Sequence, residues 1–309
     1  MRRAGKPLRH LGSAVMRGDQ LARLIRPHLS AEIRVHVLPF HAGLIPPVAM
    51  RAIALSVPRG SVVVFVKSAA KGLTAEHLEP LRRRGARIGL DSIDWPLDAI
   101  DFDLFDFHIA ASLAGKAALE ERLRSLEMAD TPVELLHHHY DPMIPLPGRE
   151  VRPFRCGYVG EPPNALIPDR IAGEIDTVEV HYAADFEKAL GRIAEFTLHY
   201  GVRPVPAPST SGARQYKPFT KGFTAAAFEA NILVNREADD AVSMLGEDYP
   251  FLVSASDLDS VVAGFERAKS GVGSTEWREG LERMRVLKEL VAPAALAARM
   301  RDIVSVVSA

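Results

Sequence analysis

The sequence predicts an α/β protein of two lobes, each a parallel β-sheet with helices on both faces, that meet across a cleft. Its 309 residues exceed what one hydrophobic core usually serves. Short apolar runs alternate with helix-like stretches, as in doubly wound sheets. A segment with four prolines, residues 140–154, interrupts this alternation, which then restarts. We therefore expect a first lobe over residues 1–146, a second over 147–292, and a C-terminal helix over 293–309.

In the first lobe, five short runs predict parallel strands, and the first two of them are rich in β-branched residues, as buried parallel strands are. They are residues 33–40, 61–68, 86–91, 105–112 and 132–139. Helices are predicted between them, over residues 13–29, 74–85 and 113–126. The second of these helices has Thr74 three residues before His77 at its start and Gly85 at its stop.

The second lobe repeats the alternation. Its predicted strands are residues 154–160, 176–182, 197–204, 232–234 and 249–255. Its predicted helices are residues 183–196, 219–229, 256–271, 275–290 and 294–307. For the helix over 256–271 we expect Ser256 and Asp259 as the N-terminal cap pair.

Composition excludes several classes of protein. The 38 Lys and Arg balance 39 Asp and Glu, so no global charge points to nucleic acid. The single cysteine, Cys156, excludes an internal disulfide framework and favours a reducing compartment. No segment approaches the ~20 apolar residues that cross a bilayer, and we expect no leader peptide, because charged residues interrupt residues 8–20. We expect a cytoplasmic protein without a transmembrane segment, with peripheral membrane contact left open.

The stretch "RQYKPFTKGFTAAAFEANILVN", Arg214 to Asn235, places two lysines at a helix start. Proline is tolerated in the first turn of a helix, so Lys217-Pro218 marks the beginning. Lys217, Lys221 and the free N–H groups of the first turn then point toward one place, which suits an anion. A solvated lysine pair is the alternative that the local sequence leaves open.

Four stretches of the chain resemble glycosyltransferases of the GT-B fold, which have two Rossmann-like lobes facing across a cleft. They are "SAVMRGDQLARLI", "GLDSIDWP", "PVELLHHHYDP", and "YKPFTKGFTAAAFEANILVN" with "LGEDYPFLVSASDLDSVVAGF". The resemblance implies a nucleotide-sugar donor, a sugar or glycan acceptor, no cofactor, and a last helix that crosses back to the first lobe. It also implies that Arg203, Lys217 and Lys221 bind the donor diphosphate. Retaining members carry two glutamates that correspond here to Lys217 and Ala225.

The resemblance implies a metal-independent reaction, in which cations stabilise the leaving diphosphate and a base activates the acceptor. Asp91 and Asp94 follow a predicted parallel strand, at the edge where open α/β sheets bind ligands, and are the candidate catalytic residues. An Asx turn and a helix cap are the alternative reading of this pair.

No metal site is expected. The tract of residues 137–139 is in a predicted strand, where consecutive side chains point to opposite faces, so three histidines there cannot share one ion. Asp101 and Asp103 have the spacing of a metal motif but belong to a loop. Five further residues are predicted to line the cleft: Ser13, Arg17, His139, Asp141 and Asn235.

The sequence therefore predicts a glycosyltransferase that moves a sugar from a nucleotide-sugar donor to an acceptor. A non-catalytic GT-B relative that binds a sugar nucleotide or a glycan is one alternative, because both glutamates are replaced. A sugar-nucleotide epimerase is the other.

Overall fold

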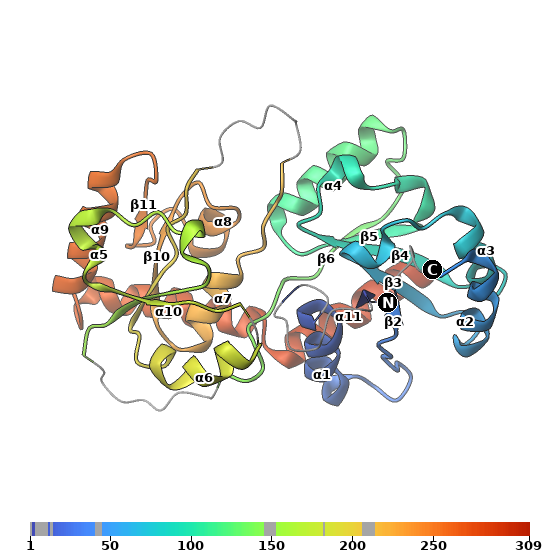
Figure 1. Ribbon diagram of the computed structural model, residues 1–309, viewed down its shortest axis with the longest axis horizontal. Helices are drawn as coiled ribbons and strands as arrows, with labels where there is room; N and C mark the ends of the chain where they lie inside the picture. Colours follow the sequence, from blue (N-terminus) through green and yellow to red (C-terminus); the bar gives the residue numbers. More distant parts are fainter. Residues whose placement is uncertain are drawn as a thin grey trace.

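The computed structural model has two main parallel sheets, one in each half of the chain (Figure 1). It describes residues 2–3, 12, 15–40, 45–144, 153–181, 183–205 and 214–309. The predicted joint between the lobes falls partly on residues 145–152, which lie outside the described residues, so the division at residue 147 stays a proposal.

The first sheet has the strand order β3-β4-β5-β6, with every neighbour parallel. Its strands are β3 (Val62–Val66), β4 (Arg87–Ile93), β5 (Phe107–Ala110) and β6 (Val133–Leu135). Alternate residues of β3 face opposite sides: Val63 and Phe65 join one buried cluster, and Val62 and Val64 pack against another. Both faces of this sheet are therefore covered, as the doubly wound prediction requires.

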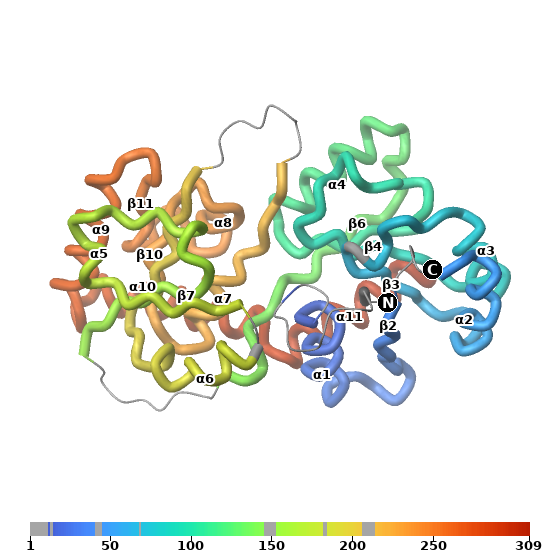
Figure 2. The backbone as a smooth tube through the Cα atoms, viewed as in Figure 1, coloured from blue at the N-terminus to red at the C-terminus, as the bar shows by residue number. Residues whose placement is uncertain are grey.

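Helices from both ends of the chain cover the first sheet. On one face lie α2 (Met50–Ser56), α3 (Ala75–Arg82) and α4 (Leu113–Ser125), and on the other lie α1 (Leu21–Ile25) and α11 (Pro293–Ser308). Residues Leu296 and Ile303 of α11 are buried with Leu21 and Phe107. The chain thus returns from the second lobe and ends on the first (Figures 1 and 2).

The prediction of a strand over residues 33–40 is wrong. Only β2 (Pro39–Phe40) forms there, and it pairs with β1 (Arg2–Arg3) outside the main sheet. The apolar residues of this run alternate with exposed Arg34 and His36, so it is not apolar on both faces as a central parallel strand is. The predicted first helix is also divided: a π-helical turn, Val15–Gln20, precedes the short α1.

The second sheet has the order β11-β10-β9-β7-β8. Its strands are β7 (Cys156–Val159), β8 (Ile175–Val178), β9 (Leu198–Tyr200), β10 (Asn231–Asn235) and β11 (Leu252–Val253). Its helices are α5 (Asp169–Ala172), α6 (Ala183–Ile193), α7 (Thr220–Ala227), α8 (Ala241–Leu245), α9 (Leu258–Ser270) and α10 (Thr275–Leu290). Asp257, whose carboxylate accepts the Asp259 N–H at 3.0 Å, caps α9 in place of the predicted Ser256 and Asp259 pair.

Two contacts join the lobes at the carboxyl ends of their strands. The carboxylate of Asp240, just before α8, accepts the N–H groups of Leu113 and Ala114 at 2.7 and 2.9 Å, at the start of α4. The ring of His137, just after β6, lies 6.1 Å from the ring of Phe223 in α7. The ligand-binding edges of the two sheets therefore face each other.

Candidate functional site

A cavity of about 230 Å³ lies between the lobes. The first lobe contributes Met16 and Asp141 to its lining, and the second lobe contributes residues at the end of β7, after β8, in α6, on β9 and in α7. Most of its surface is apolar, and its polar groups include Asp141, Thr220 and Lys221. An apolar cavity with a few charged groups at a sheet edge is the usual form of a small-molecule site. We refer to it as the interlobe cavity.

Lys221 is the cation that reaches this cavity. Its ammonium donates to the Val159 carbonyl at 2.6 Å and lies 4.1 Å from the centre of the Tyr158 ring. Burial, together with the nearby charges of Arg203 and Lys217, lowers the pKa of Lys221 to about 7. The backbone of Gly160 passes so close that a Cβ atom there would lie 3.3 Å from the ammonium, at a φ of +136° that favours glycine.

The structure brings the three predicted diphosphate residues together, because Arg203 and Lys217 both act electrostatically on Lys221. Arg203 follows β9, and burial lowers the pKa of its guanidinium. Lys217 is exposed just before α7, and its backbone N–H donates to Asp239 at 2.9 Å. Arg203 and Lys217 therefore lie near enough to affect the charge of Lys221 in the first turn of α7, whose N–H groups also favour an anion.

Asn235 does not line the interlobe cavity but is buried behind it. Its side-chain oxygen accepts the Arg203 N–H at 3.0 Å, and its amide nitrogen donates to Glu237 at 3.1 Å. The side chain therefore fixes the loop that carries Arg203. We interpret Asn235 as a residue that positions a cation, in place of the predicted direct contact.

Asp91 and Arg17 form a buried ion pair in the first lobe. The Nε and Nη2 atoms of Arg17 each lie 2.8 Å from one carboxylate oxygen of Asp91, and Nη1 donates to the His137 carbonyl at 2.8 Å. Burial raises the pKa of Asp91, and Arg17 opposes that rise. Both side chains are enclosed, with 4% or less exposed, so they bind each other and not a solvent-facing ligand. This arrangement argues against the predicted roles of Asp91 as a base and Arg17 as a cleft residue.

Asp94 is placed differently, because it lies just beyond the end of β4 and is partly exposed. Its carboxylate pairs with the ammonium of Lys67, which follows β3. Lys67 and Ile93 both have left-handed backbones, with φ of 44° and 58°, although neither is glycine. Such strain at the ligand edge is typical of functional sites.

Asp141 and His139 come from the segment after β6. Asp141 lines the interlobe cavity, and its two oxygens accept hydrogen bonds of 2.8 Å from the Gln20 amide and the Met143 N–H. The buried His139 ring lies against the carbonyls of Met16 and Tyr140, at 2.8 and 2.6 Å. Burial lowers the pKa of His139, and the hydrogen bonds to the two carbonyls oppose that effect. The ring thus joins two backbone segments, and no contact with a ligand in the cleft is needed to explain it. The predicted residue Ser13 lies outside the described residues.

Sequence reasoning missed several residues of the site. Tyr158, under the ammonium of Lys221, looks like an ordinary strand residue in the sequence, and Gln20 bonds to Asp141 from 121 positions away. Gly160, directly after an apolar run, gave the signal that could have been used. In the part of the chain that the structure describes, no group of His, Cys, Asp or Glu is arranged to hold a metal ion.

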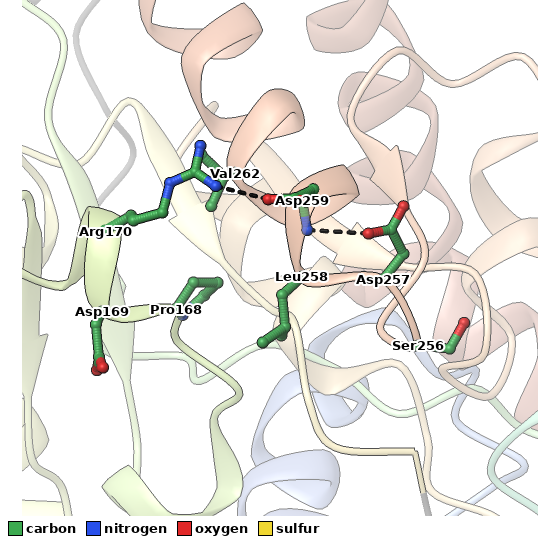
Figure 3. A pocket seen from close by; sticks show the side chains of 8 residues that line it. All are labelled: Pro168, Asp169, Arg170, Ser256, Asp257, Leu258, Asp259 and Val262. Atoms are coloured by element: carbon green, nitrogen blue, oxygen red, sulfur yellow. Dashed lines mark hydrogen bonds and ion pairs between the residues drawn. The ribbon is translucent and has the colours of Figure 1, made fainter.

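A larger hollow of about 680 Å³ lies between α5 and the start of α9 (Figure 3). Arg170 pairs with the Asp259 carboxylate at 2.6 Å, and the Asp257 carboxylate accepts the backbone N–H of Asp259. None of the predicted site residues lines it. We therefore place the candidate site at the interlobe cavity, where residues of both lobes meet.

The fold has counterparts among solved structures of glycosyltransferases. The chain superposes on "Crystal structure of GtfA/B complex" with a TM-score of 0.56 at 12% identity, covering 84% of this chain and 60% of that one. It superposes on "Trehalose-6-phosphate synthase. OtsA" with a TM-score of 0.53 at 12% identity, covering 84% of this chain and 75% of that one. It superposes on Anabaena Alr3699/HepE in complex with UDP and glucose with a TM-score of 0.53 at 9% identity, covering 83% of this chain and 81% of that one. The chain has the GT-B fold.

Sequence comparison adds little to this likeness. A family model described as "Domain of unknown function (DUF5753)" matches residues 8–89, less than half of the chain. No curated protein matches the sequence of this chain. The fold class predicted from the sequence is confirmed by the GT-B structures, although the chain spans only about 60% of the GtfA/B chain that it matches. Among the described residues, no helix is long and apolar enough to cross a membrane.

Proposed function

We propose that this protein is a cytoplasmic, metal-independent glycosyltransferase, which moves a sugar from a nucleotide-sugar donor to an acceptor. The observation that carries the proposal is the convergence of Arg203, Lys217 and Lys221 at the start of α7, beside the interlobe cavity. A diphosphate placed there would meet three cations and the N–H groups of a helix start. A solved GT-B neighbour holds UDP and glucose, which supports this class of donor.

The three cations would have different roles toward the diphosphate. Lys221 is enclosed among apolar groups, where water does not stabilise its charged form. An anion that enters the cavity would stabilise that charged form. Arg203 has a planar guanidinium that can bind two oxygens at once. Lys217 is exposed and would attract the donor from solution. Together they would stabilise the charge that develops on the departing nucleoside diphosphate.

For the base we retain Asp94 and set Asp91 aside, because Asp91 is enclosed with Arg17. Asp94 is partly exposed at the ligand edge, although it must first exchange Lys67 for the acceptor hydroxyl. Asp141 lines the interlobe cavity from the same lobe and is the second candidate to contact the sugar. Asp94→Asn should remove turnover and keep donor binding if this carboxylate is the base.

The test begins with calorimetric titration of nucleoside diphosphates and their sugar conjugates into the full chain. Lys221→Ala should weaken the best ligand by about tenfold or more, the loss expected for a charge-assisted hydrogen bond of about 1.5–3 kcal/mol. Lys188→Ala, an exposed lysine on α6, is the matched control. If no nucleotide binds the wild type, or if Lys221→Ala binds it equally well, the donor site is wrong.

A non-catalytic GT-B protein that binds a sugar nucleotide is the second candidate. Two observations favour it: Lys217 and Ala225 stand where retaining relatives have glutamates, and Asp91 is enclosed in an ion pair. Release of nucleoside diphosphate from a bound donor, followed over time, separates the two functions. Binding without release in the presence of varied acceptors would favour the second.

A further inference from the structure

The outer face of α2 is apolar where a surface helix is normally polar. Val48, in the turn that leads into α2, is 70% exposed, and Leu55 in its last turn is 73% exposed. The opposite side of the same helix buries Met50 and Ala54 in the core. A helix with apolar residues on both sides is expected to have a second partner besides its own core.

Basic residues accompany these two apolar side chains. Val48, Arg51 and Leu55 are spaced three and four residues apart, so they lie along one side of the helix. Exposed Arg59 follows in the next turn of the chain, and the Arg84 guanidinium donates to the Val57 carbonyl at 3.0 Å. We call Val48, Arg51, Leu55 and Arg59 the α2 face.

The charge of this region differs from that of the remaining chain. Residues 45–87 contain eight Lys and Arg but two Asp and Glu, which gives a net charge of +6. The rest of the chain has 30 basic residues (38 minus 8) and 37 acidic residues (39 minus 2), a net charge of −7. Figure 1 places α2 and α3 at the end of the first lobe that points away from the second lobe. Part of the positive charge of residues 45–87 is offset, because Lys67 pairs with Asp94 and Arg82 lies near Asp106. The charge of the α2 face comes from exposed Arg51 and Arg59, since residues 45–60 contain no acidic residue.

We propose that the α2 face docks on a membrane surface that contains anionic lipids. Aliphatic side chains of a surface helix enter the boundary between headgroups and acyl chains, and arginines beside them bind lipid phosphates. Two aliphatic groups with a few arginines give reversible attachment and not insertion. The interlobe cavity lies away from this end, so a docked protein keeps its candidate site open.

Two other occupants fit the α2 face less well, a second copy because of its charge and nucleic acid because of its aliphatic side chains. A two-fold contact between copies of this chain would place each α2 face against its own copy and bring Arg51 and Arg59 close to the same residues of the partner copy. Nucleic acid would use the arginines but not Val48 or Leu55, and residues 45–60 contain no aromatic side chain for base stacking. An anionic bilayer uses both parts of the α2 face.

Vesicle flotation of the full chain tests this proposal, which does not depend on the proposed function. Wild type should bind phosphatidylcholine vesicles that contain phosphatidylglycerol at least roughly tenfold better than phosphatidylcholine alone, and high salt should reduce the binding. Val48→Ser with Leu55→Ser should lose most of the binding. Arg51→Gln with Arg59→Gln should lose the preference for anionic lipid.

The matched control is Val286→Ser with Val306→Ser, two valines that are 52% and 49% exposed on α10 and α11. This control should bind as wild type does. All substituted residues are exposed, so the thermal midpoints of the variants should stay close to that of wild type. Equal binding by wild type and Val48→Ser/Leu55→Ser overturns the proposal. The proposal is also overturned if wild type self-associates or binds duplex nucleic acid without vesicles and Val48→Ser/Leu55→Ser does not.

Discussion

At the scale of single residues, burial determines what the ionisable groups can do. Asp91 and Asp94 are three positions apart and looked equivalent in the sequence, yet one is enclosed with Arg17 and the other is partly exposed beside Lys67. Residue type and strand-edge position could be read from the sequence. The partners could not, because Arg17 is 74 positions from Asp91 and belongs to a different element.

Lys221 should bind a proton together with a diphosphate. Its pKa is about 7 in the unliganded protein because it is buried near two other cations, and an anion would raise that pKa toward the ordinary value of 10.5. At pH 8 most of the unliganded protein is neutral at Lys221, so binding should take up close to one proton per site. At pH 6 the lysine is already charged and the uptake should vanish. Titrations in buffers of different ionisation enthalpy measure this number.

Lys221→Arg is the control for this uptake, because arginine stays protonated throughout the range. It should remove the proton uptake at pH 8 and retain part of the affinity. An uptake that the arginine variant leaves unchanged would belong to another group, and Lys221 would then not contact the anion.

His108 should make the protein less stable in acid. Its ring is fully buried between Phe102 and Phe105, and neither ring nitrogen has a hydrogen-bond partner among the described residues. Burial lowers its pKa from 6.5 to about 4. The folded state therefore resists a proton that the unfolded chain accepts. The stability from His108 is fully present above pH 6.5 and is lost as the pH falls toward 4, by at most about 3 kcal/mol.

Urea unfolding of His108→Phe at pH 7, 5.5 and 4 checks this, because phenylalanine keeps the aromatic packing and does not titrate. The variant should lose less stability than wild type between pH 7 and pH 4. His36→Gln, at an exposed position, should follow wild type. Identical pH dependence in wild type and His108→Phe would show that the buried ring is not the acid-sensitive group.

At the scale of elements, the sequence predicted those parts whose signals are local. The helix α3 begins after Thr74, whose backbone N–H donates to the His77 ring at 3.2 Å, and Gly85 follows it with a φ of +72°. The α7 helix also lies within one or two residues of its predicted limits. Capping and turn chemistry depend on a few adjacent residues, so the sequence reveals them.

The strand predicted over residues 33–40 failed for the opposite reason. Whether a short apolar run enters a sheet depends on a partner strand far away in sequence, and no local pattern specifies that partner. The cap of α8 shows the same limit. Asp239 binds Arg214 and the Lys217 N–H, and Asp240 turns toward the other lobe, so neither forms an ordinary local cap.

At the scale of the whole molecule, Asp240 holds the lobes in contact. Its carboxylate accepts two N–H groups at the start of α4, where the helix dipole also favours a negative charge. Its own backbone is left-handed, with a φ of +63°, a conformation that costs free energy in a residue other than glycine. The contact between the lobes therefore compensates for local strain in the second lobe. We call the arrangement with this contact closed and one without it open, and we expect their free energies to differ by only a few kcal/mol.

Asp240→Ala should shift the protein toward a more open arrangement of the lobes. Loss of two hydrogen bonds to a charged group removes at least the ~1.5–3 kcal/mol of one such bond from the closed form, which corresponds to roughly tenfold or more in the closed-to-open ratio. Fluorescence transfer between dyes on Glu121→Cys in α4 and Glu187→Cys in α6 can measure the separation of the lobes. The dyes should label only these two positions, because burial raises the pKa of the native Cys156 thiol and leaves it unreactive. Asp239→Ala is the matched control, since Asp239 accepts hydrogen bonds from Arg214 and the Lys217 N–H, both in the second lobe. Unchanged transfer in Asp240→Ala, or an equal change in both variants, would mean that other contacts hold the lobes together.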